Sequence, residues 1–195
     1  MFPDNILGGG WRLVRRVKAG SQFHPATDNL LGTDVYGTFV NDPTIDSTFS
    51  RQFDSTAVQD FLFASGDGTT YLVANRDAVV GGFYEYEPRK ISLSSKSVIL
   101  SGPSEYYAKW LRRTGEMSLS DPWISLTDHA LALQQGLIIY AGNSSESTIT
   151  ANFLQKHNGV NVWVRYTPKG IHSTFIVIHI PIFIPYLIIS NTVII

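Results

Sequence analysis

Tyrosines alternate with glutamates over residues 84–87, and these side chains are the best suited to ligand binding in this sequence. The segment GGFYEYEP carries Tyr84 and Tyr86 in alternation with Glu85 and Glu87. An aromatic ring with a polar tip suits stacking on a sugar ring, and carboxylates accept hydrogen bonds from hydroxyl groups. These four residues are therefore the candidate ligand-binding residues. The same alternation is also typical of a half-buried strand, which is the alternative interpretation.

A second group of candidate functional side chains consists of His24, Asp28 and Asp34. As ligands of a cation they would act from a loop, because Pro25 argues against a helix that places His24 and Asp28 on one face. Alternatively, His24 and Asp28 fasten the loop through hydrogen bonds to its backbone, as aspartates do in turns. We favour this second interpretation.

Asp128 and His129, with Ser125 just before them, invite comparison with a hydrolase. Adjacent residues on a helix do not face each other, so Asp128 cannot orient His129 there. The sequence contains neither a G-x-S-x-G nor an H-E-x-x-H motif. It also has no cysteine, which excludes a thiol nucleophile, disulfides and cysteine-ligated metals. We therefore expect a protein that is not an enzyme, with a hydrolase as the least favoured alternative.

Charge and length bound the class of protein. The chain has 195 residues and a net charge of −1, which fits one domain and creates no basic field that attracts nucleic acid. Every charged side chain precedes Gly170. The sequence thus predicts a folded domain over residues 5–168, followed by an apolar tail over residues 171–195.

The tail contains a candidate transmembrane segment. The 21 residues from 175 to 195 carry no charge, and a helix of this length spans about 30 Å, the thickness of the hydrocarbon core of a bilayer. Pro181 and Pro185 each remove a backbone donor, which membrane helices tolerate. The alternatives are a pair of buried strands, or translated noncoding sequence outside the fold. The opening MFPDNILGGG lacks the regions of a secretory signal peptide. Either the protein starts in the cytosol, or the chain is a fragment that lacks its original N-terminus.

The predicted fold class is α+β, with short antiparallel strands, a few short helices and long loops. Alternation predicts a strand over residues 11–17 with Trp11, Leu13 and Val17 on one face. Arg15 breaks that face, so the strand is expected to end there or to lie at a sheet edge. A hairpin is predicted where GDG joins residues 60–65 to 69–75. Further strands are expected within 90–100, over 137–142 and over 161–166, helices over 104–115, 127–136 and 150–159, and loops over 23–48.

Both ends of the predicted domain resemble a known family. GGGWRLVRRV, residues 8–17, resembles the opening strand of fibrinogen-related domains and of intelectins, and GVNVWVRY, residues 159–166, resembles their closing strand. The resemblance is confined to these two segments, and the disulfide cysteines of that family are absent. It implies that the first and last strands lie close together, with Trp11 and Trp163 buried on them.

The resemblance also implies an extracellular recognition module that binds glycans, acetylated groups or protein ends, often with calcium. The candidate calcium ligands are Asp67 and Asp77. Neither SGDGTT nor ANRDAV contains the run of alternating carboxylates that a calcium loop needs, so calcium binding stays an open expectation.

We expect a non-enzymatic recognition module that binds a glycan or protein ligand through surface loops. We expect the protein to be extracellular, lumenal or attached to a membrane, and we include oligomers among its expected states. Asn143 lies in an N-S-S sequon, which is a candidate glycosylation site in a lumenal protein. The alternative is a structural domain that assembles with copies of itself.

Overall fold

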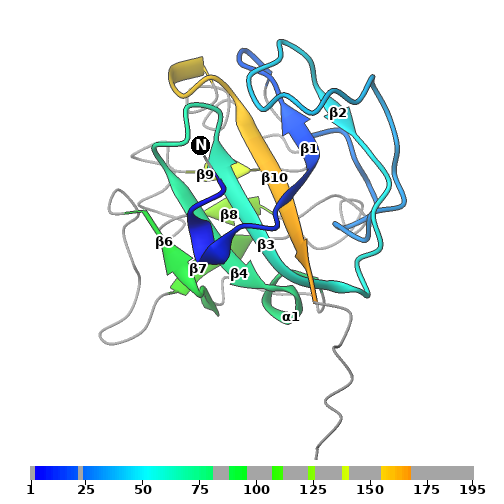
Figure 1. The fold of residues 1–195 in the computed structure, drawn as a ribbon. Coiled ribbons are helices and arrows are strands. Elements are labelled where there is room, and N and C mark those ends of the chain that lie inside the picture. Colours follow the sequence, from blue (N-terminus) through cyan, green and yellow to red (C-terminus); the bar gives the residue numbers. More distant parts are fainter. Residues whose placement is uncertain are drawn as a thin grey trace, which may run out of the picture.

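A computed structural model of the chain describes residues 3–21, 24–80, 88–95, 107–111, 123–125, 138–140 and 155–167. Nearly all of these residues belong to strands or to the loops that join them (Figure 1). The first sheet has six antiparallel strands in the order β2-β1-β10-β3-β4-β6. Its strands are β1 (Arg12–Val17), β2 (Phe49–Ser50), β3 (Val58–Ser65), β4 (Tyr71–Asn75), β6 (Leu93–Ser94) and β10 (Val160–Tyr166).

A second sheet of four antiparallel strands lies behind the first (Figure 1). Its order is β5-β7-β8-β9, with β5 (Pro88–Lys90), β7 (Tyr107–Leu111), β8 (Trp123–Ser125) and β9 (Ile138–Tyr140). Tyr140 of β9 is fully buried and packs on Phe63 of β3, with ring centroids 5.6 Å apart. The interior between the sheets is therefore apolar and aromatic.

The α+β prediction is wrong, because the described residues form mostly antiparallel sheet. Their named helical elements are the 3-10 turn η1 (Ile6–Gly8) and the four-residue helix α1 (Arg76–Val79). The helix predicted over residues 104–115 is a strand at Tyr107–Leu111, which pairs with β5 and β8. This stretch also alternates in the strand period, and pairing on both sides satisfies its backbone groups. The helix predicted over 127–136 lies outside the described residues, and only the end of the one over 150–159 lies within them.

The predicted hairpin is confirmed. β3 and β4 pair in antiparallel register, with Leu62 opposite Val73. Side chains alternate across β3, so that Phe61 and Phe63 join one buried cluster while Leu62 and Ala64 join another. The six-stranded sheet is therefore buried on both faces. This explains why the four successive residues from Phe61 to Ala64 of β3 are all apolar, rather than only every second one.

The first and last described strands pair directly, as expected. β1 runs antiparallel to β10, with Leu13 opposite Trp163. Trp163 is buried, with 6 % of its surface exposed, which confirms the expectation for that residue. Trp11 precedes the first strand and is only half-buried, so its predicted burial is right in part. Its Nε1 donates to the carbonyl of Ile6 at 2.8 Å.

The prediction that β1 ends at Arg15 or lies at an edge is wrong. β1 continues to Val17 between β2 and β10. The register shifts between Leu13 and Arg15, and such a bulge places two successive side chains on one face. Val14 and Val17 accordingly belong to the cluster that contains Phe53, and the Arg15 guanidinium lies over the Phe53 ring at 5.6 Å. Leu13 and Val17 therefore lie on opposite faces, contrary to the predicted phase.

The run of glycines before Trp11 forms the sharp entry into β1. Gly8, Gly9 and Gly10 all have positive φ, at 81°, 80° and 78°, a region that side chains with a Cβ rarely adopt. A Cβ on Gly9 would also lie 3.0 Å from the carbonyl oxygen of Asp4. The chain thus folds back on η1 before it joins the sheet.

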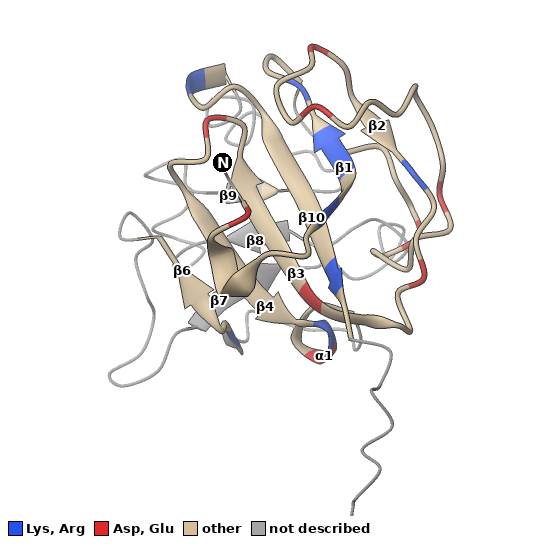
Figure 2. Cartoon of the chain, in the orientation of Figure 1, with Lys and Arg blue, Asp and Glu red and all other residues tan. Residues whose placement is uncertain are grey.

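Arg165 of β10 fastens this N-terminal turn to the sheet. Its Nη2 lies 2.6 Å from Oδ2 of Asp60, which is directly opposite on β3, and Figure 2 shows this pairing of a basic and an acidic position. Its Nη1 donates to the carbonyl of Leu7 at 2.6 Å, and its guanidinium lies 5.2 Å from the centre of the Trp11 ring. One side chain therefore joins η1, β10 and β3.

Among the described residues, no helix is long and apolar enough to cross a membrane. The tail over residues 171–195, which contains the predicted membrane segment, lies outside the described residues.

Candidate functional site

The structure leaves the predicted ligand-binding residues undescribed. Tyr84, Glu85, Tyr86 and Glu87 lie outside the described residues, as do Asn143 and the pair Asp128 and His129. Their roles stay predictions.

Asp67 and Asp77, the predicted calcium ligands, lie in different elements and contact different partners. Asp67 lies in the turn between β3 and β4, and Asp77 lies on α1, beyond the other end of β4. Asp77 pairs with Arg76 at 3.0 Å. In the part of the chain that the structure describes, no group of three or more His, Cys, Asp or Glu side chains is placed to hold a metal ion.

The Asp67 carboxylate organises the β3–β4 turn. Its Oδ1 accepts hydrogen bonds from Ser65 Oγ at 2.6 Å and from Thr69 N and Oγ1 at 3.0 and 2.7 Å. Its Oδ2 lies 3.0 Å from Nδ1 of His157, which precedes β10. Burial raises the pKa of Asp67, but these hydrogen bonds outweigh burial and lower the pKa to about 2.

This shift predicts a pH dependence of stability. A carboxylate whose pKa is lower in the folded state stabilises the fold above its ordinary pKa, and this stabilisation is lost as the pH falls through the folded-state value. The Asp67 side chain is 35 % exposed, so solvent screening limits the expected contribution to about 1 kcal/mol. In urea unfolding, wild type should exceed Asp67→Ala by this amount at about pH 5, and the difference should shrink towards pH 2. A difference that is constant with pH would contradict this assignment.

His24 and Asp28 accept hydrogen bonds from the loop backbone, as the favoured interpretation expected, and Asp34 does the same. Oδ2 of Asp28 accepts from the backbone N–H groups of Thr33 and Asp34 at 2.7 and 3.0 Å. Oδ2 of Asp34 accepts from Thr27 N at 2.6 Å. These contacts close the loop over residues 27–34 on itself.

His24 is fully buried between two tyrosines. Its ring centroid lies 5.0 Å from that of Tyr36 and 5.6 Å from that of Tyr140. Burial, and then the charge of Arg15, keep the pKa of His24 well below its usual value, so the ring is neutral. Because Ala26 N donates to Nδ1 at 3.2 Å, the proton lies on Nε2, which contacts the Tyr36 hydroxyl. This histidine is a structural group of the core.

Arg15 and Asp28 form a buried ion pair that the sequence pattern did not predict. Nη2 of Arg15 lies 2.5 Å from Oδ1 of Asp28, with side chains 0 % and 2 % exposed. Nε of Arg15 donates to Ser50 Oγ at 3.1 Å, and Ser50 Oγ donates to the carbonyl of Asp34 at 2.6 Å. Burial raises the pKa of Asp28, but the charge and hydrogen bond of Arg15 and the two backbone donors outweigh it and lower the pKa. The pair thus connects β1 rigidly to the loop over residues 28–34.

Arg16 supports the next loop from the other face of β1. It is almost fully buried and donates to the carbonyls of Ile45 and Pro43, each at 2.5 Å. It also donates to Asn161 Oδ1 on β10 at 3.1 Å. Burial lowers the pKa of Arg16, while the charges of Asp42 and Asp46 oppose this shift. The two arginines of β1 therefore hold two long loops in place.

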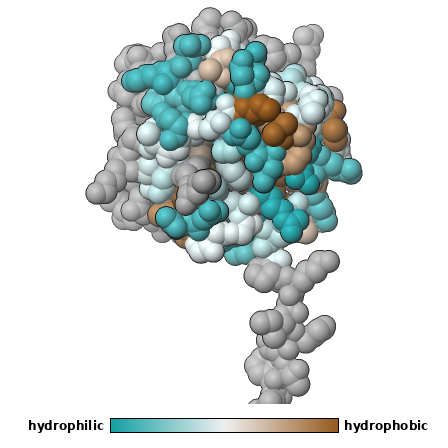
Figure 3. All heavy atoms as spheres, turned by 45° about the horizontal axis from the view of Figure 1, so that its top comes forward, coloured by the Kyte–Doolittle hydropathy of each residue, from teal (hydrophilic) through white to brown (hydrophobic). Residues whose placement is uncertain are grey.

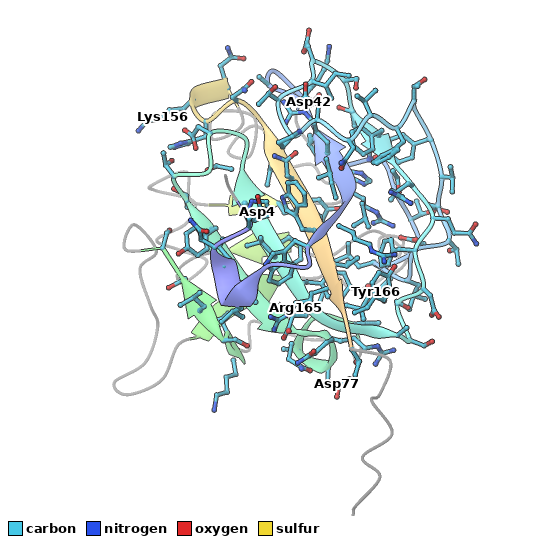
Figure 4. The ribbon with its side chains drawn as sticks, in the orientation of Figure 1. Asp4, Asp42, Asp77, Lys156, Arg165 and Tyr166 are labelled. Atoms are coloured by element: carbon cyan, nitrogen blue, oxygen red, sulfur yellow. The ribbon has the colours of Figure 1, made fainter. Side chains whose placement is uncertain are left out.

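A shallow groove lies at the end of the six-stranded sheet where β10 ends and α1 lies. It consists of two adjoining depressions of about 670 and 420 Å³ that share Thr56, and we call it the end groove. Figure 4 places Tyr166 and Asp77 at this end of the sheet. The larger depression is lined by Leu31, Gly32, Thr33, Gln52, Phe53, Asp54, Ser55, Thr56 and Tyr166, and the smaller by Thr56, Val58, Gln59, Asn75, Arg76, Asp77 and Thr167.

The walls of the end groove are fixed by close contacts. The backbone N–H of Phe53 donates to the Gly32 carbonyl at 3.1 Å. A Cβ on Gly32, where φ is 85°, would lie only 2.1 Å from the Phe53 carbonyl oxygen. Thr33 is held by Asp28, as described above. The ion pair in the core therefore sets the position of one wall of the groove.

Hydrogen-bonding side chains surround an aromatic ring in the larger depression. Thr33, Gln52, Asp54 and Thr56 are exposed, and Tyr166 is half-buried. Oδ1 of Asp54 accepts from Thr56 N and Oγ1, and these bonds lower its pKa. The guanidinium of Arg12 lies 5.1 Å from the centre of the Tyr166 ring. The groove thus offers donors, acceptors and an aromatic surface.

Comparison with known proteins found no matching family model, no similar curated protein and no similar solved structure. The class that the structure defines is a two-sheet antiparallel domain with long loops and an open groove lined by both polar and apolar side chains.

Proposed function

We propose that this domain is a non-enzymatic recognition module that binds a glycan in the end groove. The observation that supports this proposal best is the composition of the larger depression, in which exposed polar side chains surround the half-buried Tyr166. Threonine hydroxyls and the Gln52 amide offer donors and acceptors, and the Asp54 carboxylate accepts from sugar hydroxyls.

The rigidity of the groove also supports binding. Ordering a loop on binding costs free energy, so a surface held in place beforehand binds more tightly than a mobile one. Loops positioned by a rigid scaffold are where binding residues concentrate. Here the loop over residues 28–34 is held by the buried Arg15 and Asp28 pair.

Replacement of groove side chains tests the proposal. On a glycan array that includes neutral and acidic oligosaccharides, wild type should bind a defined set, and Tyr166→Ala should lower affinity for that set about tenfold or more because it removes the aromatic surface. Gln52→Ala should weaken binding about threefold, since it removes one neutral hydrogen-bonding group. Gln155→Ala, an exposed glutamine outside the groove lining, is the matched control and should leave binding unchanged.

The same array with calcium and with a chelator tests the calcium expectation. Loss of binding with chelator would indicate a calcium-dependent ligand. The absence of any glycan signal in wild type, with or without calcium, would overturn the proposed function.

Self-assembly is the second candidate, favoured by exposed apolar side chains in one loop. Leu31, Val35, Phe39 and Val40 are between 36 and 62 % exposed. On the face that Figure 3 presents, hydrophobic residues form small patches, and hydrophilic residues surround these patches. Concentration-dependent sedimentation that Val35→Ser abolishes, without any glycan binding, would favour this candidate.

A further inference from the structure

Arg76 gives the smaller depression of the end groove a cationic group in a fixed position. Its Nε donates to the carbonyl of Ser55 at 2.8 Å, which fixes the plane of the guanidinium. Its side chain is 29 % exposed and lines the depression together with Gln59 and Asn75. A fixed guanidinium offers paired donors that match a carboxylate in geometry.

The carboxylate that now pairs with Arg76 is easily replaced. Asp77 is the next residue in the chain, and its side chain is 85 % exposed at 3.0 Å from Nη1 of Arg76. Exposed ion pairs of this kind contribute little, because water competes for both charges. A single hydrogen bond, from Nη1 of Arg76 to Oδ1 of Asp77, is the contact that a ligand would have to replace. A ligand carboxylate can therefore take its place.

The two depressions differ in charge in a way that orients a ligand. The larger is lined by Asp54, which accepts hydrogen bonds from hydroxyl groups, whereas the smaller is lined by Arg76 together with its exposed partner Asp77, which a ligand carboxylate displaces. The neighbouring Asp60 is already neutralised by Arg165 at 2.6 Å. An anionic group is thus repelled by Asp54 and attracted by Arg76, while hydroxyl groups suit the larger depression.

We propose that the ligand of the end groove is an acidic oligosaccharide, with a uronic acid carboxylate on Arg76 and a neighbouring ring beside Tyr166. This inference rests on the proposed function and adds the substrate class. Thr56, which lines both depressions, lies between the two sugar units. The Asp77 side chain competes with the ligand carboxylate and sets the affinity.

Trigalacturonic acid and its methyl ester test this inference by calorimetry at low salt, because the ester keeps the sugar units and linkages but replaces each charged carboxylate with a neutral methyl ester. Wild type should bind the acid about tenfold more tightly than the ester, and Arg76→Gln should bind both alike. Asp77→Asn should bind the acid about threefold more tightly than wild type, because it removes the competitor. Arg51→Gln, an exposed arginine that lies over the Phe39 ring, is the charge-matched control and should keep the preference.

The outcomes separate the two proposals. Equal binding of acid and ester by wild type, or a preference that survives in Arg76→Gln, overturns the acidic ligand while the recognition function stands. Failure of the acid to bind wild type also overturns the inference, and the array with neutral oligosaccharides then decides the proposed function separately. Circular dichroism of each variant shows that the fold is retained, as expected for partly exposed positions.

Discussion

Replacing Asp28 with alanine is expected to lower the free energy of unfolding by about 3–5 kcal/mol, because it removes the Asp28 carboxylate from its ion pair with the buried Arg15 guanidinium. Arg15 is fully buried, and Asp28 is its ion-pair partner at 2.5 Å. The backbone N–H groups of Thr33 and Asp34 lose their acceptor in the same variant. Chemical denaturation monitored by tryptophan fluorescence measures the loss.

Two further variants separate the ion pair from simple loss of side-chain volume. The double variant Arg15→Met with Asp28→Leu removes both charges and should recover much of the stability, because apolar residues often replace buried pairs at little cost. Asp46→Ala is the matched control, since that carboxylate is 86 % exposed, and it should change stability by less than about 0.5 kcal/mol. A loss of similar size for Asp28→Ala and Asp46→Ala would contradict the structural role of the pair.

Asp28→Ala also connects the core to the end groove. The loop over residues 28–34 forms one wall of the groove, and its position depends on the Asp28 carboxylate. At a temperature where the variant is still folded, its glycan affinity should fall although Asp28 does not line the groove.

Trp163→Ala should cost about 3–5 kcal/mol, the usual loss when a large aromatic side chain is removed from a core. Trp163 is 6 % exposed and packs in the buried cluster with Leu13, Leu62 and Phe49. It lies opposite Leu13, so its loss also weakens the pairing of β1 with β10. Urea unfolding gives the change, and a loss below about 1 kcal/mol would contradict this packing.

Trp163→Phe and Trp11→Ala provide the comparison for this prediction. The buried Nε1 of Trp163 has no hydrogen-bond partner among the described residues, so Trp163→Phe loses volume but no hydrogen bond and should cost less than Trp163→Ala. Trp11 is half-buried and its Nε1 donates to Ile6, so Trp11→Ala should cost less than Trp163→Ala as well. A larger loss of stability for Trp11→Ala than for Trp163→Ala would contradict this prediction.

Local pattern in the sequence determined the β3–β4 hairpin, the strand over 160–166 and the glycine turn before β1. In each case the residues that determine the local structure are neighbours in the sequence. Two strand-forming segments that flank a GDG turn define the hairpin, and positive φ at Gly8–Gly10 requires residues without a Cβ.

Only the tertiary structure decided whether Tyr107–Leu111 is a helix or a strand. Its residues satisfy both periodicities, and its strand form depends on pairing with β5 and β8. Those partner strands lie outside the segment and cannot be recognised from its own residues. The capping and stop residues around it therefore favoured a helix in the sequence analysis. Tertiary hydrogen bonding overrides local propensity in this case.

The burial of two adjacent arginines and the assembly of the end groove were likewise decided by the tertiary structure. In β1 a bulge turns Arg15 towards Asp28, while Arg16 reaches the carbonyls of Pro43 and Ile45. The groove brings together residues 31–33, 52–56, 75–77 and 166–167. A charged residue in an apolar strand signals that a partner exists, but the partner lies in a distant loop. The identity of that partner follows from packing, because a buried charge is tolerated only where a counter-charge or hydrogen-bond acceptors meet it.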